Sequence, residues 1–199
     1  MTGLHELDAV VIDGRSGSGK TSLADSLVRR LRGRGREAQL LRVEDLYPGW
    51  DGLVAGSRAV AAALAAGSYR RYDWLRGEFA EQVMISSTRP LIIEGCGAVT
   101  ADNLAAVRQW VRQHGSRAAG LPPAARAPRA SEASRARGAE AQEAVWSVWL
   151  DLPSEQRRSR ALARDGETFA PHWDRWAAQE DAHYAEHEPW TLVDEVLRG

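Results

Sequence analysis

Four short stretches rich in apolar residues stand out along the 199-residue chain, and the first of them is β-branched throughout. They lie at residues 10–12, 38–43, 90–95 and 145–150. Short apolar runs of this kind are typical of strands that are buried on both faces of a sheet. A further run at residues 190–193 predicts a last short strand. The chain is therefore expected to contain a sheet of about five strands.

Helical periodicity separates these runs. Leu23, Leu27 and Leu31 fall four residues apart, which places them on one face of a helix that ends before Gly33. We expect Ser154 to cap another helix, because it follows a proline and precedes a long polar stretch. Further helices are predicted at residues 53–66, 102–110, 154–164 and 173–186. Strands that alternate with helices predict an α/β fold, with a parallel sheet covered on both faces.

One segment lacks any such pattern. Residues 115–142 consist almost entirely of Ala, Arg, Pro, Ser, Gly and Glu, with one leucine and no aromatic residue. This composition buries too little apolar surface to offset the entropy of ordering the chain. We therefore predict one domain over residues 1–199, with a low-complexity insertion that is disordered or partly helical. A basic arm for RNA is the alternative reading of the same segment.

Composition and charge narrow the class of protein. A net charge of -1 gives no general reason to expect nucleic acid or an anionic membrane as a partner. Cys96 is the only cysteine, which excludes an internal disulfide. The N-terminus lacks the pattern of a signal peptide, and no stretch approaches the ~20 apolar residues of a membrane span. We expect a cytoplasmic protein, whose oligomeric state the sequence leaves open.

The strongest chemical signal lies between the first strand and the first helix. Residues 14–21, GRSGSGKT, match the motif G-x-x-x-x-G-K-[ST], and we call them the P-loop. In this motif the backbone N–H groups point at phosphate oxygens beside the positive end of a helix. Lys20 would reach the β- and γ-phosphates, and the Thr21 hydroxyl would bind Mg²⁺. The sequence predicts Mg²⁺ and ATP as ligands, with the nucleotide bound by Gly14, Ser16, Gly17, Ser18, Gly19, Lys20, Thr21 and Ser22.

The choice of lysine at this position supports that prediction. Lys20 is the only lysine among 26 basic residues, so the chain uses arginine everywhere else. A compact ammonium group suits the phosphate site better than a planar guanidinium group. A glycine-rich turn that binds nothing is the alternative. A standard guanine pocket would need an Asn-Lys-x-Asp motif with a second lysine, so a GTPase of that kind is excluded. The signature loop of ABC-type ATPases is also absent.

Several short motifs, taken in order, resemble one family. They are the P-loop, the acidic tip at residues 44–49, Tyr72-Asp73-Trp74, and the stretches 92–95 and 157–165. Together they are similar to the uridine kinase-like branch of the P-loop kinases, in particular to small actinobacterial ATP-binding proteins of that branch. The resemblance implies a three-layer fold with a five-stranded parallel sheet of order 2-3-1-4-5 and a helical lid. It also implies transfer of the ATP γ-phosphate to a hydroxyl of a nucleoside or similar small molecule.

The resemblance also implies an acceptor site. Asp45 matches the carboxylate that follows the second strand and takes the proton of the acceptor hydroxyl. The family has Asp-x-Phe-Tyr at this point, whereas this chain has Asp45-Leu46-Tyr47, one residue shorter. Asp73 matches the residue that holds the hydroxyls of the acceptor, and Tyr47 and Trp74 are expected beside it. A turn role for Asp45 and core positions for the aromatic residues are the alternatives.

Metal and lid residues follow in the same way. Glu94 ends the third strand as the family's glutamate does, and the resemblance implies that it holds Mg²⁺ with Thr21. Arg157, Arg160 and Arg164 lie at positions i, i+3 and i+7, on one helical face. The family's lid arginines occupy such a face, where they clamp the triphosphate and the transferring group. A chance stripe is the alternative in an arginine-rich chain. The implied catalytic set is Asp45, Lys20, Arg160 and Arg164, with Arg157 on the nucleotide.

Two further hypotheses stay open. His183 and His187 are four residues apart and could share a metal ion, but the sequence offers no convincing third ligand. Trp173 and Trp176 fit the packed face of the last predicted helix. Finally, the chain could bind ATP as a non-catalytic sensor rather than act as a kinase.

Overall fold

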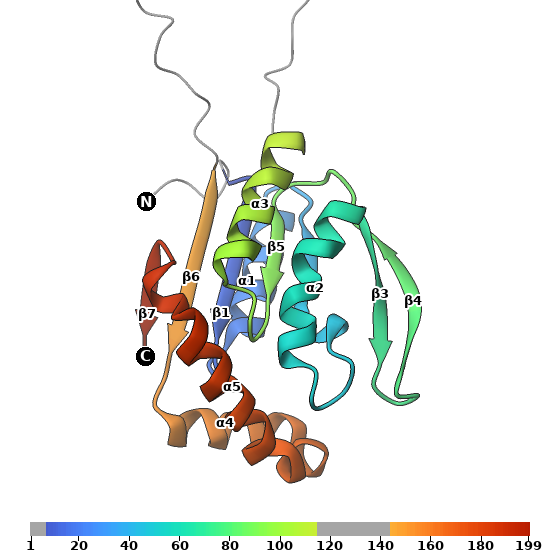
Figure 1. Ribbon diagram of the computed structural model, residues 1–199. Helices are drawn as coiled ribbons and strands as arrows, with labels where there is room; N and C mark the ends of the chain where they lie inside the picture. Colours follow the sequence, from blue (N-terminus) through green and yellow to red (C-terminus); the bar gives the residue numbers. More distant parts are fainter. Residues whose placement is uncertain (1–6, 115–143) are drawn as a thin grey trace, which may run out of the picture.

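The computed structural model describes residues 7–114 and 144–199, which form a three-layer α/β structure (Figure 1). Its central sheet has five parallel strands in the order β2-β5-β1-β6-β7. The strands are β1 Ala9–Gly14, β2 Gln39–Arg42, β5 Leu91–Glu94, β6 Val145–Asp151 and β7 Glu195–Arg198. Counted within this sheet alone, the order is 2-3-1-4-5. The predicted fold class is therefore confirmed.

The two faces of the central strand build two separate cores. Ala9 and Val11 of β1 pack in the core beneath α2 (Leu53–Ala66) and α3 (Ala101–His114). Val10 and Ile12 point to the opposite face and pack with apolar residues of α1 (Lys20–Arg32). Figure 1 shows α1 behind the sheet and α3 in front of it. Strict alternation along a strand with two buried faces explains why the strand is apolar throughout.

Two helices lie across the carboxyl ends of the strands, at the bottom of Figure 1. They are α4 (Ser154–Phe169) and α5 (Trp173–His187), joined by the 3-10 turn η2 (Ala170–His172). Gly166 interrupts α4 with φ 54° and ψ -134°, which kinks the helix. A second 3-10 turn, η1 (Val43–Leu46), directly follows β2. These elements surround the end of the sheet where ligands of open α/β folds bind.

Two sequence-based expectations need correction. The last strand is not at residues 190–193, because Pro189–Thr191 forms the 3-10 turn η3 and the strand β7 begins only at Glu195. Proline lacks the N–H that a paired strand needs, and the Asp194 carboxylate instead fixes the chain by accepting hydrogen bonds from Ser147. Ser154 makes no side-chain cap. It is the first helical residue, and Pro153 occupies the N-cap position.

A two-stranded hairpin was not predicted from the sequence. The strands β3 (Ser68–Asp73) and β4 (Glu78–Met84) pair antiparallel beside the main sheet, at the right of Figure 1. Asp73 shapes the turn, because its Oδ1 accepts hydrogen bonds from the backbone N–H groups of Leu75 (2.9 Å) and Arg76 (3.1 Å). The mixture of arginines and aromatic residues concealed the period-two alternation that marks such strands.

The predicted insertion at residues 115–142 lies outside the described residues, so its disorder and the single-domain organisation stay predictions. The flanking elements are α3, which ends at His114, and β6, which begins at Val145. Neither of the two described ranges contains a helix long and apolar enough to cross a membrane.

Candidate active site

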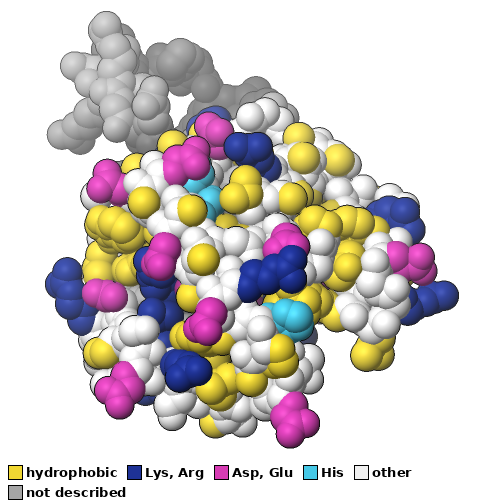
Figure 2. All heavy atoms as spheres, turned by 60° about the horizontal axis from the view of Figure 1, so that its bottom comes forward, with side chains coloured by type: hydrophobic (Ala, Val, Ile, Leu, Met, Phe, Trp, Pro, Cys, Tyr) yellow, Lys and Arg dark blue, Asp and Glu magenta, His cyan; other side chains and the backbone are white. Residues whose placement is uncertain are grey.

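One cleft opens at the carboxyl ends of β1, β2 and β5, on the face turned forward in Figure 2. Acidic and basic side chains are interspersed on this face rather than gathered in fields of one sign. One half of the cleft, the phosphate half, is lined by the P-loop with Glu94, Cys96, Arg164 and Asp165. The other, the aromatic half, is lined by Tyr47, Trp50, Trp74, Phe169 and Trp176. Glu44 also lines the cleft.

The P-loop has the strand-loop-helix setting that its motif predicts. It follows β1 directly and leads into α1, which begins at Lys20. Gly17 has φ 80°, and a Cβ atom there would lie 2.1 Å from the backbone oxygen of Arg157, so only glycine fits. Ser16, Gly17, Gly19, Lys20 and Thr21 line the cleft, whereas Gly14, Ser18 and Ser22 do not.

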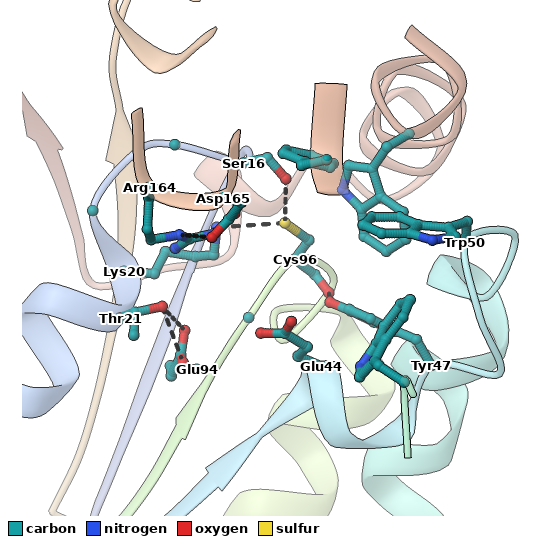
Figure 3. A pocket seen from close by; sticks show the side chains of 16 residues that line it. Ser16, Lys20, Thr21, Glu44, Tyr47, Trp50, Glu94, Cys96, Arg164 and Asp165 are labelled. Atoms are coloured by element: carbon teal, nitrogen blue, oxygen red, sulfur yellow. Dashed lines mark hydrogen bonds and ion pairs between the residues drawn. The ribbon is translucent and has the colours of Figure 1, made fainter. Parts of the chain in front are cut away.

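Lys20 is buried at the floor of the phosphate half. Its ammonium group donates to the backbone oxygen of Arg15 (3.1 Å) and to the Cys96 sulfur (3.4 Å), as Figure 3 shows for Cys96. Burial lowers the pKa of Lys20, but nearby carboxylates, among them Glu180 and Glu94, outweigh it, so the pKa is raised overall. Burial also raises the pKa of the Cys96 thiol to about 12. The site therefore offers a cation beside a neutral thiol.

Asp13 supports the P-loop from below, a role that sequence reasoning missed. Its fully buried carboxylate accepts hydrogen bonds from the N–H of Gly14 (2.6 Å), the N–H of Val99 (2.8 Å) and the hydroxyl of Tyr184 (2.9 Å). Asp13 thereby ties β1 to the loop after β5 and to α5. Burial raises its pKa to about 6, against the opposing effect of these hydrogen bonds. A lone carboxylate that ends an apolar strand just before the first motif glycine was the available signal.

The two predicted metal ligands lie together. The Thr21 hydroxyl is 3.3 Å from Oε1 of Glu94, and a dashed line joins the two side chains in Figure 3. Hydroxyl and carboxylate oxygens are the donors that Mg²⁺ prefers, and Mg²⁺ commonly uses few protein ligands. The pair therefore fits the ion. Arg42 also contacts Glu94, at 2.7 Å, and holds Asp25 with its other nitrogen, at 2.8 Å.

The structure separates the two acidic residues that follow β2. Asp45 does not line the cleft, because it accepts a hydrogen bond from the Tyr69 hydroxyl (3.2 Å) and pairs with Arg71 (3.4 Å), both on β3. Glu44 is the residue in the cleft, and Figure 3 shows its carboxylate turned toward the space that Lys20 and Thr21 also face. Sequence analysis missed it, although Glu44-Asp45-Leu46-Tyr47 fits Asp-x-Phe-Tyr without a gap if Glu44 takes the first position.

Glu44 has an unusual electrostatic setting. Much of its surface is open to solvent across the cleft, yet protein surrounds the carboxylate closely enough that desolvation is the main cause that raises its pKa. Arg164 opposes this shift, while Glu94, Asp165 and Asp45 add to it. A carboxylate with a raised pKa binds protons more readily near neutral pH than an ordinary one.

The predicted acceptor residues divide into two groups. Asp73 is placed in the hairpin turn and does not line the cleft, whereas Tyr47 and Trp74 do. The Tyr47 hydroxyl donates to the backbone oxygen of Cys96 (2.7 Å), and its ring meets Trp176 edge-on at 4.9 Å. The Trp74 ring lies 4.9 Å from that of Trp50, and its buried Nε1 has no partner among the described residues. Together these rings form an apolar wall opposite the P-loop.

The three arginines of the predicted lid face do not act together. Arg157 is buried and donates to the backbone oxygens of Leu152 (3.1 Å) and Ser16 (3.1 Å), so it braces the P-loop from outside the cleft. Arg160 is exposed and does not line the cleft. Arg164 does line it, and holds Asp165 through two hydrogen bonds of 2.8 and 2.6 Å. One of the three, Arg164, therefore lines the cleft.

The histidine pair on α5 lies away from the cleft. The rings of His183 and His187 are 4.4 Å apart, and both nitrogens of the buried His183 lack a hydrogen-bond partner among the described residues. Burial lowers the pKa of His183 to about 4. Within the described ranges, no three His, Cys, Asp or Glu side chains are grouped to hold a metal. Trp173 and Trp176 are buried, as predicted for a packed face.

Comparisons with known proteins bear on the fold. No profile of a known protein family matches the chain, and no curated protein matches it. A solved structure described as a possible uridine kinase from Bacillus stearothermophilus is 18% identical, with a TM-score of 0.52 over 96% of this chain and 88% of that chain. One described as a candidate fructose transport system kinase from Silicibacter sp. TM1040 is 16% identical, with a TM-score of 0.57 over 96% and 90%. The chain therefore shares the three-layer α/β fold of these two proteins.

Proposed function

We propose that the protein transfers the γ-phosphate of ATP to a hydroxyl of a small molecule, of which a nucleoside is one example. The observation that carries the proposal is the composition of the cleft. A phosphate-binding motif with a buried lysine stands at one side, and a carboxylate and an aromatic wall stand at the other. A cleft of this kind can hold a triphosphate and a ring-bearing acceptor within reach of each other.

The charged and metal-binding groups of the phosphate half have defined tasks in this proposal. The backbone N–H groups of the P-loop and Lys20 bind the phosphates, in keeping with the motif. Thr21 and Glu94 would hold Mg²⁺, which would neutralise phosphate charge when bound. Arg164, at the rim of the cleft, would stabilise negative charge on the transferring group once it exchanges Asp165 for phosphate.

Glu44 takes the role of general base in place of Asp45. The acceptor hydroxyl must lose a proton as its oxygen attacks phosphorus, and the base must face both the acceptor and the phosphates. Glu44 meets this requirement because it lines the cleft, whereas Asp45 is bonded to Tyr69 and Arg71. The raised pKa of Glu44 suits a proton acceptor that works near neutral pH.

A second candidate function is non-catalytic ATP binding. The ion pair between Arg42 and Glu94, at 2.7 Å, favours it, because the guanidinium group competes with a metal ion for the same carboxylate. In that case the cleft would bind ATP, and no acceptor would cause ADP release.

Two neighbouring carboxylates provide a matched test of the proposed base. We expect Glu44→Gln to lower acceptor-dependent ADP release by roughly two to four orders of magnitude, the usual range for loss of a general base. Asp45→Asn should change it only a few-fold, since Asp45 lies outside the cleft. Both variants should bind ATP as the wild type does, measured by calorimetry. The acceptors to assay are a panel of nucleosides and other small ring-bearing alcohols.

The reverse ranking of the two variants would return the catalytic role to Asp45. Absence of ADP release with every acceptor, together with tight ATP binding, would favour the sensor. Absence of ATP binding would refute both candidate functions.

A further inference from the structure

A buried carboxylate on α5 lies directly behind the wall of the phosphate half. Glu180 is 1% exposed and does not itself line the cleft. Its three hydrogen-bond donors, Ser16, Cys96 and Trp176, all do. Glu180 is thus separated from a bound ligand by a single layer of residues.

The two carboxylate oxygens have different partners. Oε1 accepts all three hydrogen bonds, from the N–H of Ser16 (2.6 Å), Nε1 of Trp176 (3.2 Å) and the Cys96 thiol (3.3 Å). Oε2 faces the guanidinium groups of Arg15 and Arg157, each at 3.9 Å. Glu180 therefore meets hydrogen-bond donors at one oxygen and cationic groups at the other. The hydrogen bonds that fix the P-loop are therefore made by one oxygen of Glu180, and the contacts with the arginines are made by the other.

The position of this charge matters for nucleotide binding. The N–H of Ser16 belongs to the P-loop, and Cys96 lies 3.4 Å from the Lys20 ammonium group, which by its motif reaches the β- and γ-phosphates. A buried negative charge here is weakly screened by salt, so it repels phosphate and offsets part of the attraction of Lys20, Arg15 and Arg157. ATP carries one more phosphate group than ADP, and Lys20 reaches the β- and γ-phosphates, so the repulsion should be larger for ATP than for ADP.

We propose, on the basis of the function proposed above, that Glu180 is a positioning residue that fixes the P-loop through Ser16 while its charge selectively weakens binding of the γ-phosphate. The carboxylate thus has two separable effects. The hydrogen bond shapes the loop, and the charge lowers the affinity for ATP more than that for ADP.

The isosteric variant Glu180→Gln separates the two effects. The amide oxygen can keep the three hydrogen bonds of Oε1, while the amide nitrogen replaces Oε2 and removes the charge. We expect the affinity for ATP to rise roughly tenfold and that for ADP by about two- to threefold, as one unit charge removed several ångströms away implies. Glu180→Asp keeps the charge and should show no such gain. Glu186→Gln, on the exposed face of the same helix, is the control for general charge effects.

Calorimetry with ATP and with ADP gives the ratio of the two affinities for each variant. Circular dichroism with thermal melting checks that each variant is folded. A loss of affinity, no change, or an equal gain for both nucleotides would overturn the proposal. Should the glutamine variant not fold, Glu180→Ala must show the same rise in the ratio of ATP to ADP affinity.

Failure of the proposed function gives a different result. If neither wild type nor Glu180→Gln binds ATP, the proposed function is refuted, and this inference with it. If only Glu180→Gln binds ATP, the inference is supported in a stronger form, in which Glu180 prevents nucleotide binding.

Discussion

At the scale of single residues, the carboxyl end of β1 concentrates charge that the fold must accommodate. Lys20 and Asp13 are both buried there, with 7% and 0% of their surface exposed. Lys20 is stabilised as a cation by surrounding acidic groups, whereas burial of Asp13 favours the neutral acid. Isolated buried charges are costly, so both residues are bound by several hydrogen-bonding partners.

Asp13 gives the stability of the protein a predictable dependence on pH. Its pKa is about 6 in the folded state and 3.8 ordinarily, so between these values the unfolded chain loses its proton first. The free energy of unfolding therefore falls by about 3 kcal/mol as pH rises from about 4 to 6, and it stays at this lower level above pH 6. We expect Asp13→Asn, which cannot ionise, to lack this fall, although it loses hydrogen bonds at every pH.

Urea unfolding of wild type and Asp13→Asn at pH 4.5, 5.5 and 7 measures the difference. The stability advantage of the wild type should shrink as pH rises. Parallel profiles for the two proteins would show that Asp13 titrates in the folded state as it does in the unfolded chain.

At the scale of elements, the kink in α4 decides which residues reach the cleft. Arg164 and Asp165 precede Gly166, and Phe169 follows it, and all three side chains line the same cleft. A straight helix would carry residues 164 and 169 to positions about 140° apart around its axis, whereas the kink lets both face one cavity. Gly166 supplies the backbone conformation for this, with φ 54° and ψ -134°.

Gly166→Ala should therefore lower stability by about 1–3 kcal/mol, the usual cost of a strained backbone conformation. No atom lies within 4 Å of the added Cβ position, so the cost is conformational rather than steric. Gly67→Ala is a matched control, because its added Cβ also meets no atom within 4 Å and its φ of 67° and ψ of 15° lie in the ordinary left-handed region. Thermal melting should rank the two variants, with the larger loss at Gly166. A larger loss at Gly67 would contradict a strained kink.

At the scale of the whole molecule, the cleft and the described residues that flank the insertion lie at opposite ends of the sheet. The insertion connects the end of α3 to the start of β6, where Val145 pairs with Ala9 at the amino end of β1. The P-loop follows the carboxyl end of the same strand. The two sites are thus separated by the length of the central strand (Figure 1).

Replacing residues 115–142 by a short Gly-Ser linker should leave the melting temperature and the affinity for ATP nearly unchanged. The reason is the low apolar content of the segment together with the distance of its attachment points from the cleft. Differential scanning calorimetry and ATP titration of the full chain and the linker variant would measure both. A clear loss of either property would mean that the segment packs on the domain.

Much of the architecture follows from local sequence. The apolar strands, the periodic helix after the P-loop and the strand-loop-helix setting of Lys20 depend on contacts between near neighbours in the chain, which a pattern records directly. The family resemblance added the sheet order, which the structure confirms. The hairpin β3-β4 was missed because its exposed arginines and partly buried aromatic residues leave only a weak alternation.

The sequence by itself determined the fold class and the phosphate-binding motif. The family resemblance implied that Thr21 and Glu94 act together, and the two side chains lie 3.3 Å apart, at the start of α1 and the end of β5. Only the tertiary structure decided which side chains share the cleft. Glu44 and Asp45 are adjacent in sequence and equal in charge, yet Tyr69 and Arg71 of the hairpin hold Asp45 and leave Glu44 facing the P-loop. Glu180 reaches Ser16 from 164 residues away. Which side chain faces the cleft depends on contacts with segments far away in the sequence, and the spacing of neighbouring residues does not predict those contacts.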